Sequence, residues 1–344
     1  MRKYKTSVIP LALLVAATGV ISFFMFQSSN VDGRVSIAGD VGLAASKYFS
    51  ALDGRVVKNS DSSAPQVVAV MVDNFPDAKP QSGLSKAKIV YEVPMEGELT
   101  RFMAIYESNQ DVSKVGPVRS ARPYFLDWLQ EYGQALYMHS GGSPVALKLI
   151  KSRNINDANE FYWGGYYWRE EGRAAPHNLY TASKNWQEII NRKNINDGFY
   201  STNSWKYARV VGKAAAGKIN KEINILFDNN YIVAWKYDAK KLDYVRYVNG
   251  EKDLDNGSEI RARNILTQTV GVKVLDSEGR KEMTTIGNGE AKILRKGKLF
   301  SGTWEKKTLS GRTRFYVDKK EVVLLPGITW VEVVSKNTKI EIIN

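Results

Sequence analysis

The chain contains no cysteine and only two histidines among its 344 residues. The missing cysteines exclude disulfide bonds, thiolate zinc sites, a cysteine nucleophile and a lipid attached to a cysteine. Stability must therefore come from packing. The two histidines, His139 and His177, lack nearby acidic residues at the spacing of a zinc motif. We therefore predict no metal site, and no feature of the sequence indicates a cofactor.

Acidic residues are fewer than basic residues. The chain has 49 Lys and Arg against 36 Asp and Glu, which gives a formal net charge of +13. Such an excess attracts anionic partners over long distances. Nucleic acid is the usual partner of a basic protein, but the export segment described next argues against it. Anionic lipid headgroups, phosphate-containing glycopolymers and lipid pyrophosphates remain as predicted partners.

Charged residues are absent from one long stretch, Val8–Phe26. These nineteen residues would span roughly 28 Å as a helix, close to the ~30 Å of a bilayer core. The cationic segment before it, residues 1–7, predicts a cytoplasmic N-terminus and an extracytoplasmic remainder. No small-x-small site follows directly, which favours a retained anchor in the cell membrane over a cleaved signal peptide. A buried core helix is the third interpretation.

The rest of the chain divides by composition. Residues 27–65 are rich in Ser, Gly, Asp and Ala, which is typical of a linker. The length that remains exceeds one usual hydrophobic core, so we expect two globular domains. In residues 66–204, apolar runs of strand length alternate with helical patterns such as residues 121–132, which predicts a layered α/β domain.

Residues 205–344 have a different character, because short β-rich segments follow one another without helical patterns. Asn249-Gly250 and Asn256-Gly257 are strong turn signals between them. We expect a mostly antiparallel β domain. The predicted fold class is therefore α+β: one transmembrane helix, an N-terminal layered α/β domain and a β-rich C-terminal domain.

Several ordered segments carry a family likeness. They are Leu52-Asp53-Gly54, VAVMVDN (68–74), PQSGLSKA (80–87), IVYEV (89–93), TRFMAIY (100–106), GPVRSARPYF (116–125), HSGGSP (139–144), APHNLYT (175–181), GTW (302–304) and LLPGITWVEVV (324–334). From residue 51 to 344 the chain resembles the YerB-like lipoproteins, a two-part domain family of unknown function. The resemblance therefore implies a family but no reaction.

The chain departs from the family pattern at several positions. Lys88 stands where the resemblance implies Asp, Glu98 where it implies Gly, and Phe75 where it implies His. The lipid-bearing cysteine of the family is also missing, so the apolar span is expected to anchor the protein. A metal or acid role at position 88 is not expected here.

A fainter likeness concerns the LytR-CpsA-Psr transferases, which move glycopolymers from a lipid pyrophosphate to the cell wall. Asp73-Asn74, Val118-Arg119 and Gly141-Gly142 follow the order of their strand-end pair, Arg-bearing loop and Gly-Gly turn. This resemblance implies a transferase of lipid-pyrophosphate substrates as an alternative function.

Arginines define the candidate binding site. Arg119 and Arg122 flank a predicted helix start, where guanidinium groups and free N–H groups favour an anion such as phosphate. They could instead pair with local carboxylates such as Glu92 or Glu96. Arg101 begins a predicted strand and could join the cluster or be solvated.

Other candidates lie at predicted strand ends. Asp73 and Asn74 end an apolar strand, where α/β sheets place ligand-binding loops, although such residues also stabilise turns. His139 and His177 could act as bases or phosphate donors, or be buried structural residues. We predict that Arg101, Arg119 and Arg122 converge on one cleft with Asp73, Asn74 and His139. His177 is a further candidate for ligand binding.

An aromatic string, residues 161–168, has two interpretations. Its rings could stack on a glycan, because aromatic side chains offer broad amphipathic faces. The same pattern suits a half-buried hairpin, which we favour.

These features predict an envelope protein that binds an anionic ligand or a cell-wall glycopolymer. One alternative is a transferase or hydrolase acting on lipid pyrophosphate, and another is a structural partner of cell-wall machinery. Catalysis is the less favoured interpretation, and no catalytic residue is assigned.

Overall fold

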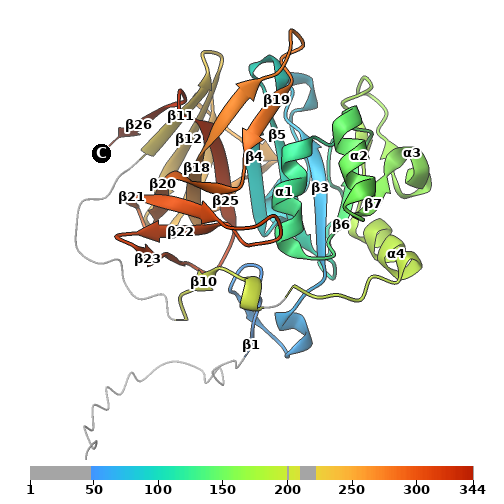
Figure 1. The fold of residues 1–344 in the computed structure, drawn as a ribbon, viewed down its shortest axis with the longest axis horizontal. Coiled ribbons are helices and arrows are strands. Elements are labelled where there is room, and N and C mark those ends of the chain that lie inside the picture. The colour runs from blue at the N-terminus through green and yellow to red at the C-terminus, as the bar shows by residue number, and fades with distance from the viewer. Residues whose placement is uncertain (1–47, 200, 210–221, 344) are drawn as a thin grey trace, which may run out of the picture. The chain divides into compact units, whose positions relative to one another are not determined.

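The computed structural model describes residues 48–199, 201–209 and 222–343, which are coloured in Figure 1. The predicted anchor at residues 8–26 and the first part of the predicted linker lie outside the described residues. Within the described ranges, no helix is long and apolar enough to cross a membrane.

A large mixed sheet of twelve strands runs through the fold in the order β23-β22-β21-β20-β18-β25-β4-β5-β3-β6-β7, with β19 paired to β18. Its strands are β3 (Val67–Asp73), β4 (Ile89–Pro94), β5 (Thr100–Glu107), β6 (Leu136–His139), β7 (Asn156–Asn159), β18 (Asn264–Val274), β19 (Lys281–Thr284), β20 (Gly287–Arg295), β21 (Lys298–Lys306), β22 (Arg314–Val317), β23 (Lys320–Glu321) and β25 (Thr329–Ser335). The central strands β3, β4, β5 and β25 are almost wholly buried. Strands buried on both faces read as continuous apolar runs, which is why these segments stand out in the sequence.

The helices pack beside the N-terminal half of the sheet (Figure 1). They are α1 (Pro123–Leu129), α2 (Pro144–Ser152), α3 (Glu160–Trp163) and α4 (Ser183–Lys193). Alternate residues of β3 point to opposite faces: Met71 packs in the same core cluster as α1 and α2, whereas Val70 packs with α4. The helix predicted at 121–132 begins at Pro123, ends at Leu129 and continues as a 3-10 turn.

A second sheet, in the order β14-β13-β12-β11-β26 with β17 paired to β13, contributes to the same core cluster as α4. Its strands are β11 (Glu222–Asp228), β12 (Tyr231–Asp238), β13 (Asp243–Val248), β14 (Glu251–Lys252), β17 (Arg261–Ala262) and β26 (Lys339–Ile343). Both predicted Asn-Gly turns are present, with positive φ at each residue. Four two-stranded sheets complete the fold: β1 (Tyr48–Phe49) with β2 (Val56–Val57), β8 (Trp168–Arg169) with β9 (Leu179–Tyr180), β10 (Lys206–Tyr207) with β24 (Val323–Leu324), and β15 (Leu254–Asp255) with β16 (Ser258–Glu259).

The two halves of the sequence share the large sheet. β25, from the C-terminal half, pairs in parallel with β4 from the N-terminal half and with β18 on its other side. Both core clusters contain residues from both halves. The fold is thus mixed α+β, mostly β with few helices, and one sheet crosses the predicted boundary between residues 204 and 205.

Candidate functional site

The loop of residues 116–122 crosses the ends of two parallel strands, β3 and β6. The Arg119 N–H donates to the carbonyl of Met71 in β3 at 3.0 Å, and the Arg119 carbonyl accepts from the N–H of Ser140, just after β6, at 3.1 Å. Ala121 N–H donates to the Gly141 carbonyl, also at 3.0 Å. The backbone therefore holds Arg119 and Arg122 at the carboxyl ends of these strands, where α/β sheets place ligands.

Asp73, the last residue of β3, connects two of the predicted residues. Its Oδ2 lies 3.0 Å from Arg119 Nε and 2.7 Å from His177 Nδ1. The His177 ring stacks on Phe75, with ring centroids 4.9 Å apart. Asp73 and Arg119 thus come together as predicted, and His177, which is 104 positions from Asp73 in the sequence, joins them.

Arg101 lies directly opposite Asp73 in the register of β3 and β5. Its Nη1 donates to the Ser120 carbonyl at 2.8 Å, while its Nε is buried without a hydrogen-bond partner. Burial lowers the pKa of Arg101 to about 10, and the charges of Arg122 and Arg119 add to this effect while Asp73 opposes it. The guanidinium is therefore held among like charges.

Arg122 completes the cluster but already has a carboxylate partner. Its Nε and Nη2 donate to the two oxygens of Glu96 at 2.8 and 3.3 Å. Although burial raises the pKa of Glu96, the hydrogen bond and charge of Arg122 outweigh it, and the net pKa is lowered. Arg122 therefore pairs with a local carboxylate, as the alternative interpretation of the arginines proposed. Both side chains line a cleft of about 530 Å³.

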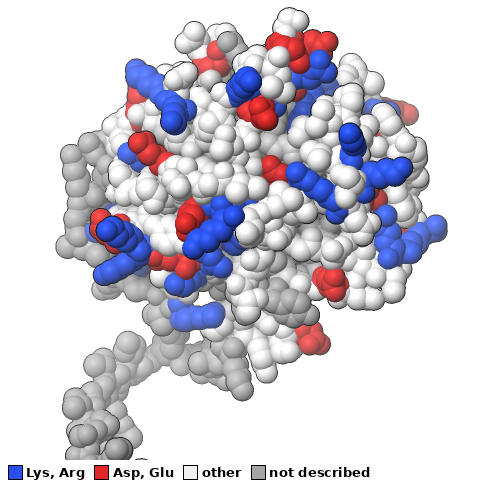
Figure 2. All heavy atoms as spheres, viewed as in Figure 1, with Lys and Arg blue, Asp and Glu red and all other residues white. Residues whose placement is uncertain are grey.

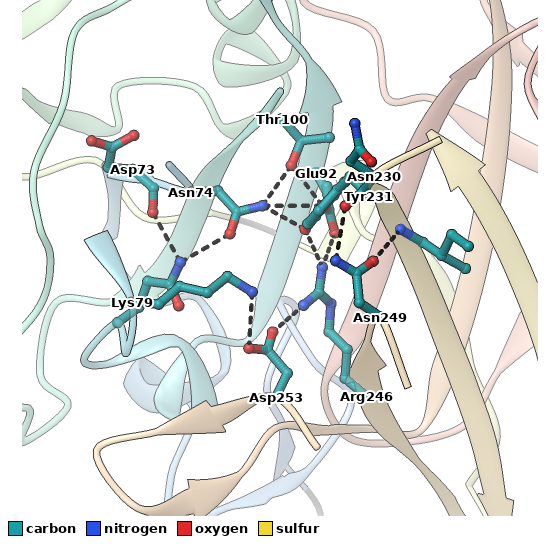
Figure 3. Close-up of polar contacts among 12 residues, drawn as sticks. Asp73, Asn74, Lys79, Glu92, Thr100, Asn230, Tyr231, Arg246, Asn249 and Asp253 are labelled. Atoms are coloured by element: carbon teal, nitrogen blue, oxygen red, sulfur yellow. Dashed lines mark hydrogen bonds and ion pairs between the residues drawn. The ribbon is translucent and has the colours of Figure 1, made fainter. Parts of the chain in front are cut away.

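Two predicted residues point elsewhere. The buried ring of His139 lies 2.7 Å from the Gly141 carbonyl through Nδ1 and 2.8 Å from Asp157 Oδ1 through Nε2. Asn74 turns away from Asp73, and its Nδ2 donates to Thr100 Oγ1 at 2.6 Å (Figure 3). Burial with two partners suits the structural interpretation of His139.

Asn74 joins a buried polar network that the sequence analysis did not identify (Figure 3). At its centre, Arg246 Nη2 lies 2.6 Å from Glu92 Oε2, and both side chains are fully buried. Arg246 also pairs with Asp253, which in turn lies 3.4 Å from Lys79 Nζ. The network forms part of the lining of a cleft of about 840 Å³ whose walls come from both halves of the chain. Glu92 and Arg246 are 154 positions apart in the sequence, so no local pattern could have indicated their pairing.

The aromatic string does not form the predicted hairpin. Residues 160–166 fold into α3 and a following 3-10 turn, and only Trp168–Arg169 forms a strand, β8. Asn159 Oδ1 accepts from the Phe161 N–H at 3.3 Å and so starts the helical turn. The hairpin interpretation was wrong, because the Asn159 cap starts a helical turn, and Gly164-Gly165 continues it as a 3-10 turn instead of a hairpin turn.

Two family models match the chain. They are the N-terminal and C-terminal domains of the protein of unknown function DUF3048, over residues 52–196 and 222–331. The chain belongs to this family. The "Putative lipoprotein YerB" of Bacillus subtilis (strain 168) is 32% identical over 274 residues, 78% of this chain and 80% of that protein. The crystal structure of the YerB protein from Bacillus subtilis matches with a TM-score of 0.76 at 28% identity, covering 86% of this chain and 100% of that one.

These matches confirm the family predicted from the sequence.

The structure also accounts for one departure from the DUF3048 pattern. Lys88 Nζ lies 3.2 Å from Asp53 Oδ2 and 3.3 Å from Glu107 Oε2, so a cation stands between two acidic side chains. In the described part of the chain, no group of three or more His, Asp or Glu is arranged to hold a metal ion.

Proposed function

We propose that this DUF3048 protein is a membrane-anchored, extracytoplasmic envelope protein that binds an anionic, phosphate-bearing cell-wall polymer. The binding site is the arginine cluster, defined as Arg101, Arg119 and Arg122. Attachment to the membrane is supported by the apolar span at residues 8–26 and by the lipoprotein name of the Bacillus subtilis relative. The net charge of +13 favours anionic partners.

One observation carries the proposed ligand chemistry. Four Lys and Arg side chains are buried among the described residues: Arg101, Arg246, Lys306 and Arg312. The last three each form an ion pair with a buried carboxylate, Glu92 or Glu131. Arg101 forms no ion pair within the described ranges, although a buried cation is costly without a partner. An anionic ligand would supply the missing charge.

The charge balance around the arginine cluster also favours an anionic ligand. Three guanidinium groups face two carboxylates, Asp73 and Glu96, and Asp73 is shared between Arg119 and His177. Guanidinium groups match phosphate oxygens through paired hydrogen bonds. The helix dipole adds little, because α1 has only 7 residues.

The experiment uses the full chain in detergent micelles and poly(glycerol phosphate) as the probe. Charge-assisted hydrogen bonds contribute about 1.5–3 kcal/mol each, so Arg119→Ala should weaken binding roughly tenfold to over a hundredfold. Calorimetric titration measures the dissociation constant. Lys307→Ala removes the same charge at a side chain that is 76% exposed, and its affinity should change little. Equal losses in both variants would instead show nonspecific attraction.

A second candidate function is transfer or hydrolysis at a lipid pyrophosphate. The observation that favours it is the Asp73–His177 contact, because a carboxylate at Nδ1 orients an imidazole whose Nε2 accepts a proton. His177→Gln should then abolish turnover of a polyprenyl pyrophosphate-linked sugar while leaving polymer binding intact. If the unaltered protein does not turn over this substrate, the transfer or hydrolysis function is excluded and only the binding function remains.

A further inference from the structure

Two large aromatic side chains stand out on the surface. Phe161 is 70% exposed and Tyr162 is 82% exposed, both in α3. The other rings of the same string are used in packing: Trp163 lies 5.7 Å from Tyr166, and Trp168 lies 6.2 Å from Tyr180. Within the described part of the chain, no ring stacks on Phe161 or Tyr162. Ring-to-ring packing therefore involves other members of the string but not this pair.

The backbone fixes this aromatic pair beside the arginine cluster. Asn159, which caps α3, also accepts from the Gly141 N–H at 2.9 Å and is itself buried. Gly141 has a φ of +63°, and a Cβ there would lie 3.2 Å from the Phe161 ring, so the ring covers the bare glycine backbone. The Gly141 carbonyl accepts from Ala121, between Arg119 and Arg122. Phe161 thus packs on Gly141, and Gly141 is joined by a backbone hydrogen bond to the loop that carries the arginines.

We propose that Phe161 and Tyr162 form an aromatic subsite that stacks on sugar rings of the polymer whose phosphate is bound by the arginine cluster. This inference rests on the proposed function and names its substrate class: a glycosylated phosphate polymer. Aromatic rings suit this role because they present a broad apolar face to the C–H side of a sugar. The neighbouring arginines bind the charge, and the rings recognise the glycan.

A membrane surface is the other partner that exposed aromatic residues fit. The immediate surroundings favour the glycan. The Phe161 ring lies against Gly141, whose carbonyl accepts from Ala121 in the loop that carries the arginines. A polymer held by those arginines would therefore pass beside the aromatic pair. Lys and Arg side chains are present nearby on this side of the molecule, over the region of α2 and α4 (Figure 2), where they would attract polymer phosphates.

The test compares two probes that differ only in sugar: poly(glycerol phosphate) with and without glycosyl substituents. The full chain in micelles should bind the glycosylated polymer about tenfold more tightly, as expected for one or two stacked rings. Phe161→Ala/Tyr162→Ala should abolish this preference and leave affinity for the plain polymer unchanged. Tyr162→Phe keeps the ring and should keep the preference. No preference in the unaltered protein, or a preference that survives the double substitution, would overturn the aromatic subsite.

Hydrogen exchange separates the glycan from the membrane. With the full chain in phosphatidylglycerol nanodiscs, amides of residues 160–163 should gain protection only when the glycosylated polymer is added. Protection by the nanodisc alone would mean that the aromatic pair docks on lipid, and the inference would be wrong. Failure of the proposed function looks different, because Arg119→Ala would then leave affinity for both polymers unchanged.

Discussion

Glu92 and Arg246 form an ion pair in which both side chains are fully buried. Removing one partner of such a pair leaves an unpaired charge without water, which costs about 3–5 kcal/mol. Arg246→Met should therefore lower the free energy of unfolding by that amount, measured by urea denaturation. Lys252→Met removes a cation from an exposed pair with Glu259 and should leave the free energy of unfolding nearly unchanged. A similar small cost for Arg246→Met would show that Glu92 is readily neutralised.

At the scale of single residues, the sequence indicated part of the site. Asp73 and Arg119 were predicted to converge, and the structure joins them through Asp73 Oδ2, which also contacts His177. An acidic residue at a predicted strand end and arginines in a later loop were enough for that prediction. Asn74 was predicted to join the same cleft but points elsewhere, because its side-chain partners Thr100 and Tyr231 come from distant segments.

At the scale of elements, β25 holds the two halves of the sequence together. Trp330 in β25 is fully buried and packs against Phe102 of β5 at 5.6 Å and Trp235 of β12 at 5.2 Å. Trp330→Ala should cost about 3–5 kcal/mol. Hydrogen exchange should then accelerate in both β5 and β12, because each loses the same packing partner. Faster exchange in β12 alone would mean that the N-terminal half is stable without β25. Val274→Ala, at a side chain that is 58% exposed, serves as the control.

Elements rich in β-branched residues were predicted well. β3, β4 and β25 appear in the sequence as such runs, although β4 and β25 each contain one Glu, and the structure buries them at the centre of the sheet. β20 and β21 were missed because glycine and charged residues interrupt their apolar pattern. They pair with each other over nine positions, so tertiary pairing overrides weak local preference. α4 was also missed, although the spacing of Trp186, Ile189 and Ile190 is helical.

At the scale of the whole molecule, parallel pairing of β4 with β25 merges the two predicted domains into a shared sheet. No pattern within either half of the sequence could indicate which strands pair across the two halves. The family models match the halves separately, at residues 52–196 and 222–331. The 840 Å³ cleft and its buried network combine residues from both halves.

The central claim is that Arg101, a buried arginine that forms no ion pair with any described residue, binds the phosphate of an external ligand. The most direct measurement is the dissociation constant of poly(glycerol phosphate) for the full chain carrying Arg101→Met, compared with the unaltered chain. Methionine fills similar space without charge, so the melting temperature should not fall, because a costly buried cation is removed. The account predicts affinity at least tenfold weaker at undiminished stability. Unchanged affinity together with a lowered melting temperature would contradict it, because Arg101 would then be a structural residue.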